Sequence, residues 1–332
     1  MGITTVTSAD CADIRRIGIP RALLYHRYGV LWETFFEKLG VEVVLSRPTD
    51  RAIVERGELL SNDECCLASK VYIGHVASLI EDEGCEAIFT PAVANFGKLE
   101  RFCTKFQALP DLTANTFRGQ ASFISCMVEE MFAKTDLAGA FAELAARFGA
   151  DKKHAKKIAQ AACEAQLQAD RTRARAQDKV LKELRKGAGE NGSPLSILLV
   201  AHPYVAYDSY IGGAVTTAIE ASGARLLLAC ESDHDKCYEA SKDFSATMPW
   251  RINRELIGAI LRTRADISGI VLLSAFPCGP DSMTNDAVMR CISGIPILNL
   301  TVDSQSGTAG LETRIESFVD ILRYQQTGGY LK

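Results

Sequence analysis

The sequence predicts an α/β fold: two similar doubly wound parallel-sheet domains, the product of an internal duplication, joined by a helical segment. Three observations predict it. Short apolar stretches alternate with helical stretches of about ten to fifteen residues, which is typical of parallel sheets with helices on both faces. This alternation occurs once in each half of the 332 residues. A stretch rich in alanine and charge, with helical spacing, separates the two halves.

The first half begins with a predicted βαβ unit, in which Gly40 ends the helix. A second helix and a third strand follow before the alanine-rich stretch. The expected elements are, in order, a strand at 14–20, a helix at 25–39, a strand at 41–45, a helix at 71–80 and a strand at 86–90.

The second half repeats this order. Pro20, Gly29 and Gly40 are each followed 183 residues later by the same residue type, which supports a duplication. The expected elements are a strand at 195–201, a helix at 210–221, strands at 225–229 and 269–274, and a closing helix at 311–325.

The domain boundaries follow from the segment between the halves. Residues 137–186 predict two or three connecting helices, and the run 186–194 combines flexible glycines with a proline just before a strand. We therefore expect an N-terminal α/β domain at 14–135, a helical connector and linker at 136–193, and a C-terminal α/β domain at 194–332.

Composition excludes several classes of function. A formal net charge of -4 gives no excess of positive charge, so nucleic acid is not an expected partner. The sequence has no secretory leader pattern and no apolar run long enough for a membrane helix, so we expect a cytoplasmic protein without a membrane partner.

The eleven cysteines are not expected to form disulfides, because the cytosol keeps thiols reduced. We expect most of them to be small core residues or inert, with four assigned to helical patterns (Cys85, Cys126, Cys163 and Cys291), Cys11 to a polar leader and Cys230 to a strand end. Cys237 stands in no motif.

Three cysteine motifs follow predicted strands and are candidates for metal binding. Cys65 and Cys66 precede a helix, and Cys103 precedes Lys105 by two residues. Cys278 stands in a Pro-Cys-Gly-Pro turn before a helix expected to start at Asp281 or Ser282. Thiolates hold iron-sulfur clusters, and a cubane with three protein ligands keeps one iron open. Either Cys65 or Cys66 could be the first ligand, and for each motif simple packing is the alternative.

Charged and titratable residues near these motifs are further candidates. A helix N-terminus and Lys70 would lower the pKa of a nearby thiol and support an anionic cluster. Lys105 could do the same, or either lysine could engage a phosphate. His202, at the end of a strand, is a candidate catalytic residue and equally a candidate structural one, whereas His75 is expected to be structural. Known nucleotide-binding loops, the serine-hydrolase elbow and zinc-ribbon cysteine pairs are absent.

Taken together, the motifs resemble the 2-hydroxyacyl-CoA dehydratase superfamily, specifically its small acyl-CoA dehydratase activase-related (CoA-protein activase) proteins. The resemblance spans nearly the whole chain. It also extends to the 2-hydroxyglutaryl-CoA dehydratase subunits and the double-cubane cluster proteins. It rests on the runs 17–23, 63–70, 74–76, 102–107, 202–208, 253–255 and 278–282.

The resemblance implies the site residues and the chemistry. It implies that Cys66, Cys103 and Cys278 are ligands of a 4Fe-4S cluster in the interdomain cleft. Lys70 matches the lysine of the family's motif. The protein would then accept low-potential electrons from an ATP-dependent activase, for reduction of a small molecule or an acyl-CoA or for electron transfer. The oxygen sensitivity of such a cluster implies anaerobic function.

Two alternatives stay open: a subunit of a 2-hydroxyacyl-CoA dehydratase, and a non-catalytic binding or scaffold module with a structural metal. A homodimer also stays open. The chain departs from the family pattern at Ala68, where proline is usual, and after Asp303, where relatives carry Glu-His. These departures leave the substrate undefined.

Overall fold

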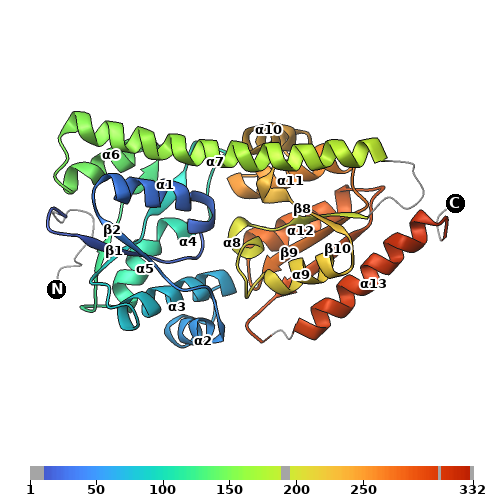
Figure 1. The fold of residues 1–332 in the computed structure, drawn as a ribbon, viewed down its shortest axis with the longest axis horizontal. Helices are drawn as coiled ribbons and strands as arrows, with labels where there is room; N and C mark the ends of the chain where they lie inside the picture. The colour runs from blue at the N-terminus through green and yellow to red at the C-terminus, as the bar shows by residue number, and fades with distance from the viewer. Residues whose placement is uncertain (1–10, 188–194, 306–307, 330–332) are drawn as a thin grey trace. The chain divides into compact units, whose positions relative to one another are not determined.

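The structure is a computed structural model that describes residues 11–187, 195–305 and 308–329. It divides into two compact units. Unit 1 runs to Ala169 and also includes Pro249–Arg251, and unit 2 comprises Asp170–Met248 and the chain from Ile252 onward. Each unit has its own parallel sheet flanked by helices, which confirms the predicted α/β class (Figure 1).

The sheet of unit 1 has four parallel strands in the order β2-β1-β3-β5. A small parallel pair, β4 with β6, extends it. The strands are β1 (Arg16–Ile19), β2 (Glu42–Leu45), β3 (Ala87–Phe89), β4 (Ala92–Asn95), β5 (Ser122–Ile124) and β6 (Met127–Glu129).

The sheet of unit 2 also has four parallel strands, in the order β10-β9-β7-β8. They are β7 (Ser196–Val200), β8 (Arg225–Leu228), β9 (Gly269–Ala275) and β10 (Ile297–Val302). When the strands of each four-stranded sheet are counted in chain order, the first lies between the second and the third, and the fourth lies beyond the third. The topology therefore confirms the predicted duplication.

Helices of unit 1 cover both faces of its sheet. On one face, Phe35 of α1 packs edge-on against Phe141 of α6, and Gln166 of α7 accepts a hydrogen bond from the Leu31 amide. The helices are α1 (Tyr25–Lys38), α2 (Arg51–Leu60), α3 (Leu67–Glu81), α4 (Thr104–Gln107), α5 (Leu109–Thr116), α6 (Leu137–Arg147) and α7 (Lys152–Gly187), the last of which continues into unit 2.

Helices of unit 2 are α8 (Pro203–Ala206), α9 (Gly213–Ala221), α10 (His234–Ala240), α11 (Arg251–Thr263), α12 (Gly279–Cys291) and α13 (Thr308–Gln326), with short 3-10 turns η1 (Ala229–Glu231) and η2 (Ser241–Asp243). Helices α9 and α13 lie side by side (Figure 1). As the sequence predicts, α13 closes the sheet, because Ile315 and Val319 are buried and Phe318 packs near Gly269.

Several predicted elements differ at their ends. Helix α3 begins at Leu67, four residues before the predicted start, and α12 begins at Gly279 rather than at Asp281 or Ser282. Helix α9 begins at Gly213 rather than at residue 210, because the Asp208 carboxylate accepts the amides of Tyr210 and Ile211 and forms a separate turn. The connector contains two helices, α6 and α7. Most of the predicted linker, residues 188–194, lies outside the described residues.

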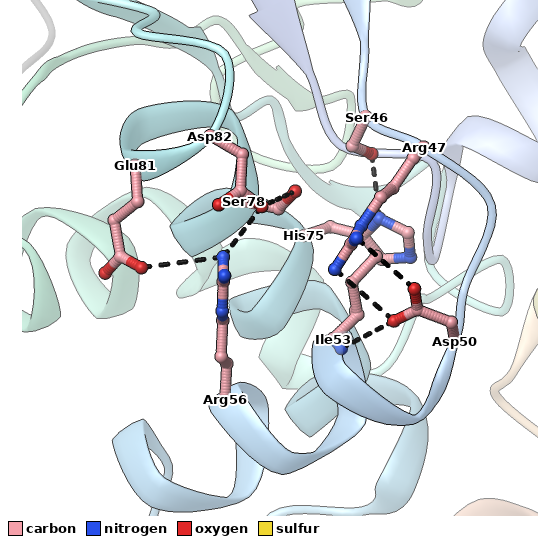
Figure 2. Close-up of polar contacts among 9 residues, drawn as sticks. All are labelled: Ser46, Arg47, Asp50, Ile53, Arg56, His75, Ser78, Glu81 and Asp82. Carbon is pink, nitrogen blue, oxygen red and sulfur yellow. Dashed lines mark hydrogen bonds and ion pairs between the residues drawn. The ribbon is translucent and has the colours of Figure 1, made fainter.

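Helices α2 and α3 cross so closely that glycine is required on both. A Cβ atom at Gly57 would overlap the Lys70 carbonyl, and one at Gly74 would overlap the Ile53 carbonyl. Arg56 of α2 adds an ion pair with Glu81 and one with Asp82 of α3 (Figure 2). The two helices thus form one packed element at the side of the sheet.

His75 ties α3 to the loop after β2 (Figure 2). The ring is fully buried, with Nδ1 2.8 Å from Ser46 Oγ and Nε2 2.9 Å from Thr49 Oγ1. A neutral imidazole meets both contacts with one donor and one acceptor nitrogen. Burial is the main cause that lowers the pKa of His75 to about 3. The predicted structural role of His75 is confirmed.

None of the helices in the described part of the chain combines the length and the apolar character required to cross a membrane.

We predict that Gly57→Ala lowers the free energy of unfolding by about 1–3 kcal/mol, because the new methyl group forces α2 and α3 apart. Gly310→Ala is the matched control, since a Cβ there meets nothing within 4 Å in helix α13. That control should be neutral or stabilising by up to about 1 kcal/mol. Thermal and urea unfolding of the two variants measure the difference, and equal stabilities would contradict the close helix crossing.

We predict that His75 makes the protein less stable as the pH falls below about 6.5, the pKa of a histidine in the unfolded chain. Its folded pKa of about 3 means that, between these values, the unfolded state binds one more proton than the folded state. Stability present above pH 6.5 is therefore lost at up to about 1.4 kcal/mol per pH unit, down to about pH 3. Urea unfolding at stepped pH should show a slope shallower by one proton in His75→Gln, and equal slopes would contradict the buried neutral ring.

Candidate functional site

Cys66 is the N-cap residue of α3. Its backbone is extended (φ -64°, ψ 153°), and its side chain accepts no hydrogen bond from the helix amides. The half-buried thiol lies 3.4 Å from Ser69 Oγ, to which it donates. Lys70 follows in the first turns of α3. The sulfur therefore stands at the positive end of a 15-residue helix, as the sequence predicts.

Cys103 is the N-cap residue of the short helix α4 and is half-buried. Lys105, on the same helix, donates a hydrogen bond of 3.2 Å to the sulfur of Cys65. This contact joins two segments that lie 40 residues apart in the chain. Unit 1 thus brings together the Cys65–Cys66 segment, which follows α2 and not a strand as predicted, and the Cys103 segment, which follows β4.

Cys278 is the N-cap residue of α12 and follows β9 in unit 2. The Phe276–Pro277 peptide bond is cis, and a Cβ atom at Gly279 would meet nothing within 4 Å. The backbone around the half-buried thiol is thus open on the Gly279 side. This is the third cysteine motif whose sulfur stands at the N-terminus of a helix.

His202 is the N-cap residue of α8 and follows β7, the strand beside β9. Its ring is 5% exposed and stacks on Tyr204 at a centroid distance of 4.8 Å. Nε2 lies 2.8 Å from Asp281 Oδ1, while Nδ1 is buried and has no hydrogen-bond partner among the residues that the structure describes. An unsatisfied buried nitrogen is costly, so a donor from a ligand or a water would stabilise this histidine.

Asp281 is the centre of a buried network in unit 2. Besides His202, its Oδ1 accepts a hydrogen bond of 2.8 Å from Asn253, and the Cys278 side chain also hydrogen-bonds to the carboxyl group. Burial by itself raises the pKa of Asp281, but the charge and hydrogen bond of His202 and the other donors outweigh it and lower the pKa. An ionised Asp281 accepts a hydrogen bond from a protonated His202 Nε2, and Nδ1 is then an acceptor in the neutral ring and a donor in the charged ring.

A small cavity lies next to this network. Its lining includes His202, Asn253, Asp281 and Thr284, with apolar residues of the strands and helices around them. It is about the size of one water molecule. It lies close to the carboxyl ends of β7 and β9, where connections leave in opposite directions, the usual ligand position in doubly wound sheets.

The other motif residues have structural partners. The guanidinium group of buried Arg254 lies 4.5 Å from the centroid of the Tyr238 ring, and its Nε donates to Ser241 Oγ. Glu255 Oε2 lies 3.2 Å from His234 Nδ1. Of the run 253–255, only Asn253 therefore reaches the network around Asp281.

The remaining cysteines are mostly core residues, as expected, although their positions differ. Cys85 lies in the loop between α3 and β3 and Cys126 between β5 and β6, so neither is in a helix. Cys230 lies in η1, and Cys291 is exposed at the end of α12. Burial raises the pKa of Cys126 to about 12 and that of Cys163 to about 11. High pKa values keep these two thiols protonated and unreactive.

The predicted site residues fall into two groups. Unit 1 contains Cys66, Cys103, Lys70 and Lys105, and unit 2 contains Cys278 and His202. In the described part of the chain, no group of three or more His, Cys, Asp or Glu side chains could hold a metal ion by itself. The meeting of all three thiols at one cluster stays a prediction.

Sequence reasoning missed the roles of Asp281, Asn253 and Cys65. Asp281 was interpreted only as a helix start, although its position three residues after Cys278 puts it one turn along the same helix. No pattern in the sequence predicts that Lys105 contacts Cys65.

Fold and site together define a class of protein: a duplicated, doubly wound α/β protein in which three cysteines cap helices α3, α4 and α12. The chain belongs to the family described as "CoA enzyme activase uncharacterised domain (DUF2229)", which matches residues 16–230. This span includes all of the unit 1 sheet and the first two strands of unit 2. The predicted activase-related grouping is confirmed at this level. No curated protein matches the chain.

Solved structures match the chain only remotely. Fe(III)-bound YtgA from Chlamydia trachomatis is 10% identical, with 93% of this chain and 98% of that chain covered and a TM-score of 0.24. The C-terminal domain of glucosamine-fructose-6-phosphate aminotransferase from Francisella tularensis is also 10% identical, with 93% and 84% covered and the same TM-score. At this TM-score neither match bears on the function.

We predict that Asp281→Ala lowers the free energy of unfolding by about 3–5 kcal/mol, because it removes the acceptor of a buried histidine and a buried amide. Asp286→Ala on the same helix is the control. Its carboxylate pairs with Arg290 at the surface, so its loss should change stability little. Chemical unfolding measures both variants, and equal effects would contradict the buried network.

Proposed function

We propose that this protein is an iron-sulfur protein that accepts low-potential electrons from an ATP-dependent activase. Cys66, Cys103 and Cys278 would hold a 4Fe-4S cluster. The electrons would serve to reduce a bound small molecule or acyl-CoA, or would pass to a further acceptor. Membership in a CoA enzyme activase family supports the link to an activase.

One observation carries this proposal: each of the three cysteines is the N-cap residue of a helix, α3, α4 or α12. None of these side chains accepts a hydrogen bond from its own helix, and none is in a disulfide. Thiolate donors beside free amides have the chemistry that an anionic iron-sulfur cluster needs. The donor set therefore fits such a cluster.

A cluster held by three thiolates supplies one-electron transfer and an iron that is open to a ligand. The chain's own residues would tune this site. Lys105 lies beside Cys65 and two residues from Cys103, and Lys70 lies four residues after Cys66. Positive charge near a cluster favours its reduced form and raises its reduction potential.

His202 is the residue of unit 2 best suited to exchange a proton with a ligand. Asp281 holds its Nε2–H, and the unpartnered Nδ1 offers a lone pair. A hydroxyl or amide group of a substrate could donate to Nδ1 in place of water. Asp281 would stabilise the ring if it took up the proton.

We predict that Cys66→Ala, Cys103→Ala and Cys278→Ala each lose the bound iron of the protein prepared or reconstituted without oxygen, because a cubane missing one of three thiolates is not retained. Iron and sulfide analysis measures the loss. Cys85→Ala and Cys163→Ala are the controls, since both residues lie away from the cysteine motifs, and they should keep full iron. Retention of iron in all three ligand variants would refute the assignment.

The electron-transfer function has its own test. The reconstituted protein is mixed with an activase of this family, ATP and a low-potential reductant, and its spectrum is recorded by electron paramagnetic resonance. An ATP-dependent signal from a reduced cluster supports the proposal. If the bound metal gives no such signal, a structural role for the metal is favoured instead. If the protein dehydrates a 2-hydroxyacyl-CoA, the assignment as a dehydratase subunit is favoured.

A further inference from the structure

The contact between Lys105 and Cys65 is unusual for a lysine. Its Nζ lies 3.2 Å from the Cys65 sulfur. Among the described residues, no carboxylate forms an ion pair with Lys105. A lysine beside a protein surface normally pairs with water or with a carboxylate, so an amine directed at a sulfur points to chemistry between the two groups.

Cys65 and Lys105 each lie in a segment of backbone that is fixed by hydrogen bonds or packing. The Cys65 amide donates to the Asn62 carbonyl, and Cys65 directly precedes the N-cap of α3. Lys105 lies on α4, where Phe106 is buried against Phe102. The sulfur and the nitrogen therefore meet as parts of two fixed segments, not as ends of two mobile loops.

The sulfur is accessible to small molecules only. Cys65 is 6% exposed, and Lys105, whose Nζ contacts its sulfur, is half-buried. A large thiol or a second protein cannot reach it easily, whereas dioxygen can. An oxidised sulfur here would meet the Lys105 amine before it met another reagent.

We propose that Cys65 and Lys105 are a modification site at which dioxygen forms a covalent nitrogen-oxygen-sulfur bridge. The S–H bond and one N–H bond break, and an S–O bond and an O–N bond form. One oxygen atom stays in the bridge, and the other leaves as water with the two released hydrogens. Sulfur and nitrogen each lose two electrons, and dioxygen takes up all four.

The bridge would act as an oxygen-responsive lock on this part of unit 1. It fixes the Cys65–Cys66 segment to α4 and converts the lysine amine into a weakly basic hydroxylamine derivative, which removes its positive charge. The chemistry depends on the contact alone. Its consequence, a change at the thiols of the candidate cluster, rests on the proposed function.

The test uses the full chain, purified without oxygen and without iron, then exposed to air and digested. Mass spectrometry should find the peptide with Cys65 joined to the peptide with Lys105, one oxygen atom heavier and two hydrogens lighter than their sum. A thiol reductant should release both peptides unmodified. The bridged species should be absent from the sample kept without oxygen.

Matched variants assign the bridge to these two residues. Cys65→Ser and Lys105→Arg should abolish the bridged species, whereas Cys66→Ser and Lys70→Arg should retain it, and circular dichroism confirms that each variant is folded. A Cys65–Cys66 disulfide, or oxidised Cys65 with unmodified Lys105, would overturn the proposal. If the unsubstituted protein forms no bridge in air but binds iron normally, this inference alone is refuted. If it forms the bridge but binds no iron, only the proposed function is refuted.

Discussion

In both units all strands of the main sheet run parallel, so the strands of each sheet end at the same edge. Helices α4, α8 and α12 each begin directly after a strand, whereas α3 follows α2. Cys66, Cys103, His202 and Cys278 are all N-cap residues, so their side chains share this environment of unpaired amides. The helix dipole contributes most at α3 and α12, which have 15 and 13 residues, and little at the single turns α4 and α8.

The same constraint explains which parts of the fold were predictable from the sequence. Apolar runs and helical spacing identified six of the strands, because these patterns reflect burial in a sheet covered on both faces. They did not identify β4, β5, β6 and β10. The starts of α3 and α12 were predicted too late, because cysteine is not among the usual N-cap residues and gives no start signal. Aspartate is a usual N-cap residue, so the start of α12 was predicted at Asp281, which lies inside the helix. At α3 and α12 the helix start was therefore missed because the residue that caps the helix is a cysteine.

The candidate site could be predicted only as a set of segments. Strand ends indicated where Cys66, Cys103 and Cys278 would lie, but side-chain partners depend on packing between distant segments. Lys105 contacts Cys65, which lies 40 residues away in the sequence, and His202 contacts Asp281, which lies 79 residues away in the sequence. No spacing rule covers such distances. The buried, ionised Asp281 is set by the donors around it, which become visible only when α11 and α12 pack on the same face of the sheet.

The duplicated units have kept their packing and changed their chemistry. Gly74 in α3 and Gly258 in α11 both allow close approach of a neighbouring carbonyl, that of Ile53 and that of Cys237, so the helix crossing recurs. At the strand ends, unit 1 has thiols with a lysine, and unit 2 has a thiol with a carboxylate and an imidazole. Backbone contact tolerates few residue types, whereas residues at the strand ends can change without loss of the fold. Function in a doubly wound protein diverges at this edge for that reason.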